Sequence, residues 1–477
     1  MNNKNEENTN NKFLRKKISC LLISFYSGIC VITDIGVKYY FKDKKKVGTA
    51  SLSKILLLFK IPYLLKPLYG LILDFYPLFG YKKKSFLFIC FFINLISWYI
   101  FLISKNDKLF TSIICHFFIN MSLSFTTVIG SAIQVDISKM YKKTTDSYGK
   151  KTSELMSEHF IIKSVGTLIP SYLKGYLIEK YSNNIIFYIS GLFSFFILVS
   201  GIILDEEKIK KNKKPSYKAK KIQITPLIEE EENENNNYKQ IIDLIKNKNI
   251  IIFLTLIFIL ESSPTCVSPL FYYETNILGL NPKNLSLIDF YSQIAIILVI
   301  IIYKNFCWKL NFKSITCFVR ISIFGIFYLI YLLIIKITQK YISDLYLVTF
   351  TTAFYGGLHS LGQLPYSLLA IQLSPLALEA TTYSLCIFSC YLGNIFADYI
   401  DYILAIFFNV THYNFENLHI LVFIENILNL IPLFYVIGIP YKFFSEKKTE
   451  NKADNKTENK TENNQQKEME TIQEEKN

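Results

Sequence analysis

The sequence is divided into apolar runs of about 20 residues, and its charged residues gather between these runs. A run of that length can cross the hydrocarbon core of a bilayer as a helix. The chain has 477 residues, of which 51% are hydrophobic, and its mean hydropathy is +0.28. A soluble chain of this length would intersperse charges along every segment. The pattern therefore predicts an all-α, multi-pass membrane protein.

Twelve apolar runs lie six on each side of a charged segment at 205–247. This layout predicts two six-helix bundles, at 18–204 and 248–443, related by a pseudo-two-fold axis along the membrane normal. We expect 1–17, the linker 205–247 and the tail 444–477 to be disordered and cytoplasmic, because they are polar and rich in charge. The expected helices cover 18–37, 52–73, 85–104, 110–135, 156–178, 184–204, 248–270, 284–303, 313–336, 344–373, 380–404 and 416–440.

The net charge of +14 comes largely from lysines in flanks and loops. Loops holding 82–84 and 139–151 fall on the same side as both termini, and the loops of the other side are poorer in cations, except for the basic loop 38–46. The positive-inside rule makes the first side cytoplasmic. The surroundings expected from this pattern are membrane lipid, with no nucleic-acid partner. The plasma membrane is favoured over an organelle membrane because the sequence shows no targeting signal.

No catalytic constellation is visible in the sequence. The nine cysteines are scattered through apolar runs without metal-ligand spacing, so we expect buried free thiols and no metal site. The G-x-S-x-G, H-E-x-x-H and Walker patterns are missing. The sequence therefore predicts neither an enzyme nor a bound cofactor.

Residues 66–85 join two apolar runs and combine small, acidic and basic residues. Gly70 allows a neighbouring helix to approach closely. Asp74 lies near the membrane edge, where it can take a basic partner or a helix N-terminus. Gly80 belongs to the following turn, and Asp136 closes the fourth helix on the same side. For the two aspartates we expect a gating role, or structural pairing with the loop cations.

The string KPLYG at 66–70, Asp74, and PLFGY at 77–81 resembles the signature of the folate–biopterin transporter family, within the major facilitator superfamily. The segment 155–175 is similar to the part of that family around its fourth and fifth helices. The resemblance implies uptake of folates or pterins, and its motif carries over to Lys66, Asp74 and Asp136.

Several charged residues lie inside the apolar runs. Each costs about 2.5–3.5 kcal/mol on insertion scales, so it usually faces a cavity or a partner. The basic ones are Lys60, Lys66, Lys163, Lys174 and Arg320, and the acidic ones are Asp34, Glu261, Asp398 and Glu425. We expect Lys66, Lys163 and Arg320 to bind substrate, whereas Lys60 and Lys174 could simply reach the interface.

Two of the expected helices are interrupted. The run 248–270 contains Glu261, two serines and two prolines, and the run 344–373 contains three glycines and a proline. Polar stripes follow one face of each of two helices: Tyr355, His359, Gln363 and Tyr366 in 344–373, and Asn120, Ser124, Thr127 and Ser131 in 110–135. Interrupted helices in two corresponding halves indicate a transporter's binding site. The resemblance to major facilitators implies that helices 1, 4, 7 and 10 line it. The alternative is hydrogen bonding between helices.

These features predict a secondary active transporter that works by alternating access, and the resemblance implies that its substrates are folates or pterins. Folate carries carboxylates and a flat ring, which Lys66, Lys163 and tyrosines such as Tyr355 and Tyr366 could bind. We expect proton coupling, with Asp34, Glu261 or His359 as carrier, although His359 could equally be a neutral core residue. The alternatives are a transporter of another organic anion or metabolite and a non-transporting membrane scaffold or receptor.

Overall fold

The computed structural model of the chain describes residues 2–41, 45–46, 49–103, 109–144, 148–180, 184–208, 242, 244, 246–374, 378–411 and 413–439. Helices form almost all of this part. The sole β feature among these residues is a bridge between Leu78 and Tyr81, in the turn of the 66–85 segment. Most of the predicted linker 205–247 and the whole predicted tail 444–477 lie outside the described residues.

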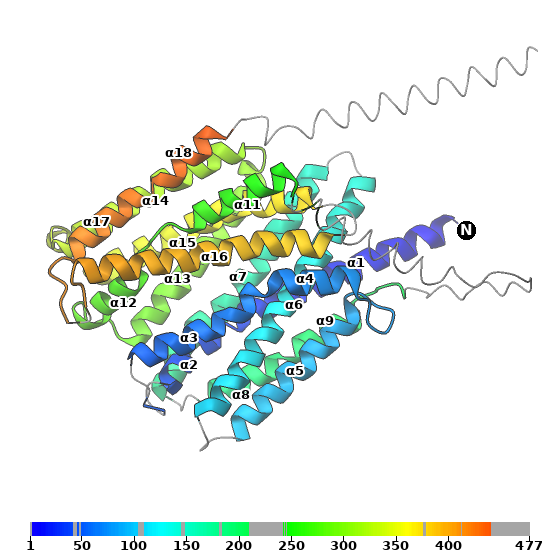
Figure 1. The fold of residues 1–477 in the computed structure, drawn as a ribbon, viewed down its shortest axis with the longest axis horizontal. Coiled ribbons are helices and arrows are strands. Elements are labelled where there is room, and N and C mark those ends of the chain that lie inside the picture. The colour runs from blue at the N-terminus through cyan, green and yellow to red at the C-terminus, as the bar shows by residue number, and fades with distance from the viewer. Residues whose placement is uncertain are drawn as a thin grey trace, which may run out of the picture.

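The N-terminal half contains nine helices in the described part, coloured from blue to green in Figure 1. Three of the expected runs, 18–37, 52–73 and 184–204, are each divided into two helices by a short break. One such break is at Leu65, between α3 and α4. The helices are α1 (Asn2–Ile29), α2 (Ile32–Tyr39), α3 (Thr49–Leu64), α4 (Lys66–Phe75), α5 (Lys84–Ile103), α6 (Leu109–Thr144), α7 (Tyr148–Lys180), α8 (Asn184–Phe193) and α9 (Phe195–Ile203). The helix α1 begins at Asn2, so the structure differs from the predicted disordered segment 1–17.

The C-terminal half is coloured from green to orange in Figure 1 and lies beside the first half. Its helices are α11 (Lys248–Glu261), α12 (Val267–Asn276), α13 (Pro282–Ile302), the π-helix η2 (Tyr303–Cys307), α14 (Phe312–Ile334), the 3-10 helix η3 (Thr338–Lys340), α15 (Asp344–Leu373), α16 (Glu379–Phe407), α17 (Leu418–Leu428) and α18 (Ile431–Gly438). The predicted interruption of the run 248–270 is confirmed, because α11 ends at Glu261 and α12 begins only at Val267.

Eight spans in the described part of the chain are long and apolar enough to cross a membrane. They cover eight of the twelve predicted runs. The other four, 52–73, 156–178, 248–270 and 344–373, are the runs that hold most of the charges, glycines and prolines noted in the sequence. The multi-pass character is confirmed, and the count of twelve stays a prediction. Large apolar side chains such as Phe92, Leu298 and Phe434 are exposed on the helix surfaces, as expected against lipid.

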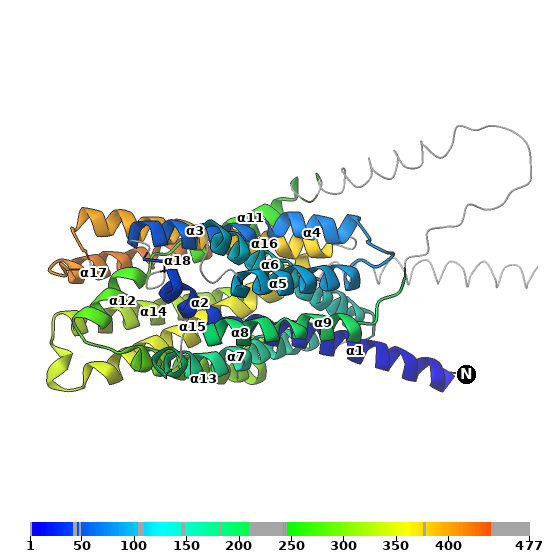
Figure 2. The same ribbon diagram turned by 90° about the horizontal axis from the view of Figure 1, so that it is seen from below.

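The two halves meet along two seams. Helix α4 packs against α16, and α7 packs against α13, and Figure 2 shows α4 beside α16 and α7 beside α13 from a second direction. A buried cluster crosses between the halves, with Val135 and Met156 from the first half and Tyr366, Ile371 and Tyr383 from the second. We call the end of the molecule that holds Asp74 and Lys83 the basic end; it is the predicted cytoplasmic end.

Candidate functional site

A cavity of about 440 Å³ lies between the halves, mainly against the C-terminal one. This volume falls within the range of about 300–1,000 Å³ that small-molecule sites occupy. Its walls come from α3, the α11–α12 break, α14, α15 and α16. Of the helices predicted to line it, the seventh and tenth do so, whereas no residue of α1, α2 or α6 is among the lining residues.

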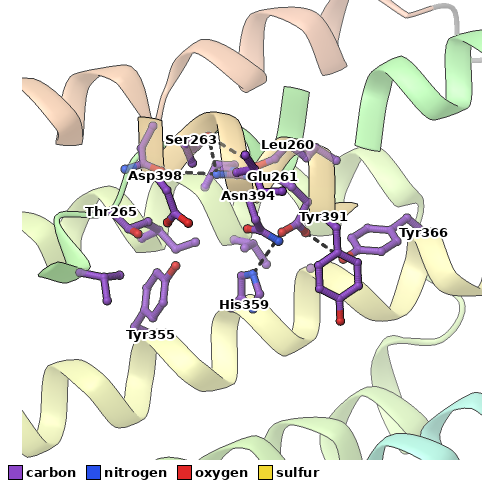
Figure 3. A pocket seen from close by; sticks show the side chains of 18 of the residues that line it. Leu260, Glu261, Ser263, Thr265, Tyr355, His359, Tyr366, Tyr391, Asn394 and Asp398 are labelled. Atoms are coloured by element: carbon purple, nitrogen blue, oxygen red, sulfur yellow. Dashed lines mark hydrogen bonds and ion pairs between the residues drawn. The ribbon is translucent and has the colours of Figure 1, made fainter. Parts of the chain in front are cut away.

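Glu261 lies at the centre of the cavity wall, at the last residue of α11, and its side chain is 6% exposed. One carboxylate oxygen accepts a hydrogen bond from the Tyr366 hydroxyl at 2.8 Å, and the other lies 3.6 Å from His359 Nε2. Figure 3 shows His359 and Tyr366 reaching Glu261 from the same helix, α15. The structure thus brings together Glu261 and His359, two of the predicted site residues. The His359 side chain is 41% exposed and lines the cavity.

Tyr355 extends this arrangement by one helical turn. Its ring stacks on His359, with centroids 5.9 Å apart and planes inclined by 20°. Tyr355, His359 and Tyr366 all line the cavity, as the polar stripe predicted. Gln363 is half-buried on the same helix and is not among the lining residues, because at that level Gly362 faces the cavity instead.

Arg320 on α14 fixes the break between α11 and α12. Its guanidinium donates hydrogen bonds to the Leu260 carbonyl and to Ser263 Oγ at 3.1 Å, and it approaches Asn429 Oδ1 at 3.5 Å. The Leu260 carbonyl is a group that the end of α11 leaves without a helical partner, and Ser263 lies in the break itself. Arg320 also interacts electrostatically with Glu261. Its donors are therefore directed mostly to the protein, although the side chain lines the cavity.

Lys66 is 3% exposed and lies behind the cavity wall. Its ammonium group lies over two tyrosine rings, 5.3 Å from the centroid of Tyr63 and 4.8 Å from that of Tyr391. Those rings pack together at 5.1 Å and both line the cavity. Lys163 on α7 is exposed and within electrostatic range of Lys66. Lys66 therefore places a basic group behind two aromatic rings of the cavity wall.

The basic end of the cavity is closed by the 66–85 motif. Asp74 accepts hydrogen bonds from Ala380 N at 3.2 Å, Thr381 N at 2.8 Å and Thr381 Oγ1 at 2.7 Å, so it caps the N-terminus of α16. The sequence predicted a basic partner or a helix N-terminus, and the structure shows the second. At Gly70, a Cβ atom would lie 2.8 Å from the Ala380 carbonyl oxygen, so glycine permits this contact.

Other predicted motif residues hold the same end together. Asp136 forms an ion pair with Lys83, the structural pairing that the sequence left open. Gly80 has φ +85°, which suits glycine in the turn before α5. Lys139 and Glu379 join the two halves at 2.7 Å. The cavity is thus sealed on this side by a cap, an ion pair and the apolar cluster described above.

The opposite end is more open. Lys60 and Asp398 form an ion pair at 2.8 Å across the cavity mouth, with side chains 49% and 59% exposed. Asp34 lies exposed on α2, within electrostatic range of Tyr63 and Tyr391. Lys174 pairs with Asp289 on α13. For Lys60 and Lys174 the sequence left open a position at the membrane interface. In the structure both lysines have acidic partners in the other half.

The polar stripe of the expected fourth helix, which is α6, was predicted to line the cavity. Its side chains form hydrogen bonds instead. Ser124 donates to the Pro62 carbonyl at 3.0 Å, and Asn120 accepts from the Tyr63 hydroxyl at 3.3 Å. Thr127 and Ser131 bond to carbonyls of their own helix. The alternative of hydrogen bonding is thus what the structure shows, and it anchors the proline-containing end of α3. Tyr63 and Tyr391 are not predicted from the sequence, because nothing in local periodicity places their rings against each other.

Interrupted helices around a polar cavity between two helical halves, sealed at one end, are the features of a secondary transporter. Residues 27–459 match the BT1 family. The chain belongs to this family, which confirms the resemblance found in the motif.

Known proteins similar to the chain are transporters. It is 28% identical to folate transporter 1 of Plasmodium falciparum over 91% of this chain and 82% of that protein. It is 25% identical to a folate-biopterin transporter of Synechocystis over 88% and 83% of the two chains. A bacterial homologue of the iron transporter ferroportin, solved in an outward-facing state, has a similar fold, with a TM-score of 0.57, 12% identity, and coverage of 89% and 98%. That likeness supports the major facilitator-like fold.

Proposed function

We propose that this protein carries folates, pterins or related organic anions across a membrane by alternating access. One observation carries the proposal: Glu261 places a carboxylate on the cavity wall, and the ammonium group of Lys66 lies behind the tyrosine pair Tyr63 and Tyr391 that lines it, with Lys163 within electrostatic range of Lys66. A folate has the matching polarity, because its pterin ring offers N–H donors and its glutamate end carries carboxylates. The kind of molecule that the relatives are named for supports the same substrate class.

The aromatic side chains suit a flat ring. Tyr355 and His359 form one stacked pair, and Tyr63 and Tyr391, whose planes are inclined by 33°, pack together at another part of the cavity wall. A pterin between them would stack on aromatic faces while its amino group reaches Glu261. The carboxylates would then lie near Lys66 or Lys163, with charge-assisted hydrogen bonds. Gln363 and Arg320 complete the predicted binding set from the periphery.

Transport requires that the sealed and open ends exchange roles. In the predicted topology the open mouth at Lys60 and Asp398 faces outward and the sealed basic end faces the cytoplasm. Proton coupling belongs to the proposal, and the carriers predicted from the sequence are Asp34, Glu261 and His359. The plasma membrane is the proposed location.

The test is uptake of labelled folic acid, 5-methyltetrahydrofolate and para-aminobenzoate into liposomes that contain the purified full chain. We expect saturable uptake, competed by unlabelled folates. Lys66→Ala and Glu261→Gln should each lower uptake by about tenfold or more, the size of a lost charged contact in a binding site. Lys248→Ala, an exposed lysine outside the cavity, is the matched control.

Competition by other organic anions but not by folates would replace the substrate class and leave the transport mechanism standing. No uptake of any of these compounds by correctly inserted protein would favour the scaffold or receptor alternative. In that case Lys66→Ala and Glu261→Gln would leave the scaffold or receptor role of the protein unchanged.

A further inference from the structure

A second buried acidic site lies beyond the cavity, between α16, α17 and the helix break. Glu425 on α17 is 0% exposed, and no hydrogen bond of standard length reaches either of its carboxylate oxygens from the described residues, although Cys266 and Asp401 interact with it. The neighbouring Leu421 and Val422 are also fully buried. An ionised carboxylate in such surroundings is strongly unfavourable without a partner. Glu425 therefore requires either a bound cation or a proton.

Asp401 on α16 is an acidic companion of Glu425. It is 8% exposed, interacts electrostatically with Glu425, and accepts a hydrogen bond from Thr265 N at 3.2 Å. Other titratable groups that face the pair are Asp398 on α16, Cys266 in the break and Tyr355 on α15. None of the ion pairs found in the described part of the chain includes Asp401 or Glu425. Two carboxyl groups in one buried site do not both ionise, so they share a proton.

Exposure falls steadily from the cavity to this pair. Asp398 lines the cavity mouth and its side chain is 59% exposed. Asp401 follows three residues later on the same face of α16, and Glu425 lies beyond it. These three carboxyl groups form a route along which a proton can pass from cavity water to the interior.

The pair also contacts the break between α11 and α12, where Asp401 accepts the hydrogen bond from Thr265 N. Cys266 has a left-handed backbone, with φ +52°, and α12 begins directly after it. The N-terminus of α12 carries positive helix-dipole charge, which favours the single negative charge that the pair retains. Interrupted helices of this kind hold coupling ions in secondary transporters. A change in the charge of the pair would alter its attraction for α12.

We propose that Asp401 and Glu425 form the proton-binding site that couples transport to a proton gradient, with Asp398 as its entrance. The proposal rests on the proposed function. A proton passes from cavity water to a carboxylate oxygen, and the same oxygen returns it to water on the other side. No group of three or more metal-ligating side chains occurs among the described residues, which favours a proton over a metal ion. Glu261 suits this task less well, because Tyr366, His359 and Arg320 already stabilise its charge.

The first test does not depend on any substrate. Infrared spectra of the purified full chain, recorded across a pH titration, distinguish the carbonyl stretch of a protonated carboxyl group from that of a carboxylate. We expect a buried carboxylic acid band in the wild type that is lost in Glu425→Gln and altered in Asp401→Asn. Glu416→Gln changes an exposed glutamate just before α17 and should keep the band. A band that survives in Glu425→Gln would overturn the assignment.

The second test uses liposomes and labelled folate. Glu425→Gln should reduce accumulation driven by a pH gradient by about tenfold, within the usual range of coupling between two ligands. Folate exchange between the two sides should continue, because it needs no net proton movement. Asp398→Asn should slow the same step if Glu425→Gln fails to fold. The proposal would be contradicted if Glu425→Gln lost exchange and accumulation equally, or if accumulation by the wild type depended on Na⁺. Absence of all folate transport in the wild type would contradict only the proposed substrate.

Discussion

The two ends of the interface between the halves are built differently. At the basic end, Asp74 is buried and accepts three hydrogen bonds from the start of α16, and Gly70 brings the two backbones together. At the opposite end, Lys60 and Asp398 meet with about half of each side chain exposed. Opening the basic end breaks buried hydrogen bonds, whereas opening the other end breaks a solvated ion pair. The described conformation is therefore held mainly by contacts at the basic end, and the proposed alternating access requires this end to open.

Among substitutions at the two ends, the largest effect on closure of the basic end is expected from a change of Gly70. A Cβ atom there would lie 2.4 Å from Ser384 Oγ and 2.8 Å from the Ala380 carbonyl oxygen. Overpacking costs about 1–3 kcal/mol, and such a penalty corresponds to about 5- to 150-fold in an equilibrium between conformations. We expect Gly70→Ala to open the basic end and to lower uptake by at least about fivefold.

The reporter for this opening is the native Cys386, which is 4% exposed within the cluster that seals the basic end. Its alkylation from the basic side, followed by peptide mass spectrometry, should accelerate in Gly70→Ala. Gly325→Ala is the matched control, because nothing lies within 4 Å of its Cβ position. Equal behaviour of the two variants would show that the α4–α16 contact does not hold the closed state.

Removal of the cap on α16 should have the next largest effect. Asp74→Ala deletes the acceptor for three hydrogen bonds, and loss of an N-cap costs about 0.5–2 kcal/mol. Cys386 alkylation should rise, and Asp74→Asn, which keeps one oxygen acceptor, should lie between wild type and Asp74→Ala. If Asp74→Asn is as impaired as Asp74→Ala, the carboxylate charge matters more than the hydrogen bonds.

These two residues also show what could be predicted from the sequence. Gly70, Asp74 and Gly80 belong to one local motif, and the motif itself indicates a close helix and a helix N-terminus. The run 344–373 likewise matches α15, because its boundaries follow from the hydropathy of one segment. Such features depend on neighbouring residues in the chain.

The cavity wall depends on residues far apart in the chain. Tyr63 and Tyr391 stack across the two halves, and Asp401 meets Glu425 from a separate helix. No periodicity within one helix encodes these meetings. The Ser and Thr stripe of the fourth helix was misread for the opposite reason, because Thr127 and Ser131 are satisfied by their own helix and need no cavity.

A smaller effect is expected at the ion pair between Lys139 and Glu379. Each side chain is 18% exposed, so water screens the pair only in part. We expect a coupling of about 1 kcal/mol, the upper end of the range for exposed pairs. A double-mutant cycle with Lys139→Gln and Glu379→Gln, followed by Cys386 alkylation, measures it. Strictly additive effects would mean that the pair contributes nothing to closure.

The smallest effect is expected at the opposite end. Lys60 and Asp398 are both more than one-third exposed, and such pairs contribute about 0–1 kcal/mol, less in high salt. Lys60→Gln should therefore leave Cys386 alkylation within about twofold of wild type. An acceleration as large as that in Asp74→Ala would erase the distinction between the two ends.

The most direct measurement follows both ends at once in active protein. Spin labels attached to unnatural amino acids with a ketone side chain would leave the native cysteines intact. One pair of labels would replace Lys150 and Lys309 at the basic end, and another would replace Phe110 and Tyr413 at the opposite end. Pulsed electron resonance then gives both distances in liposomes with and without folate and a pH gradient. The account predicts that the basic-end distance lengthens while the opposite distance shortens. Active uptake with both distances unchanged would contradict it.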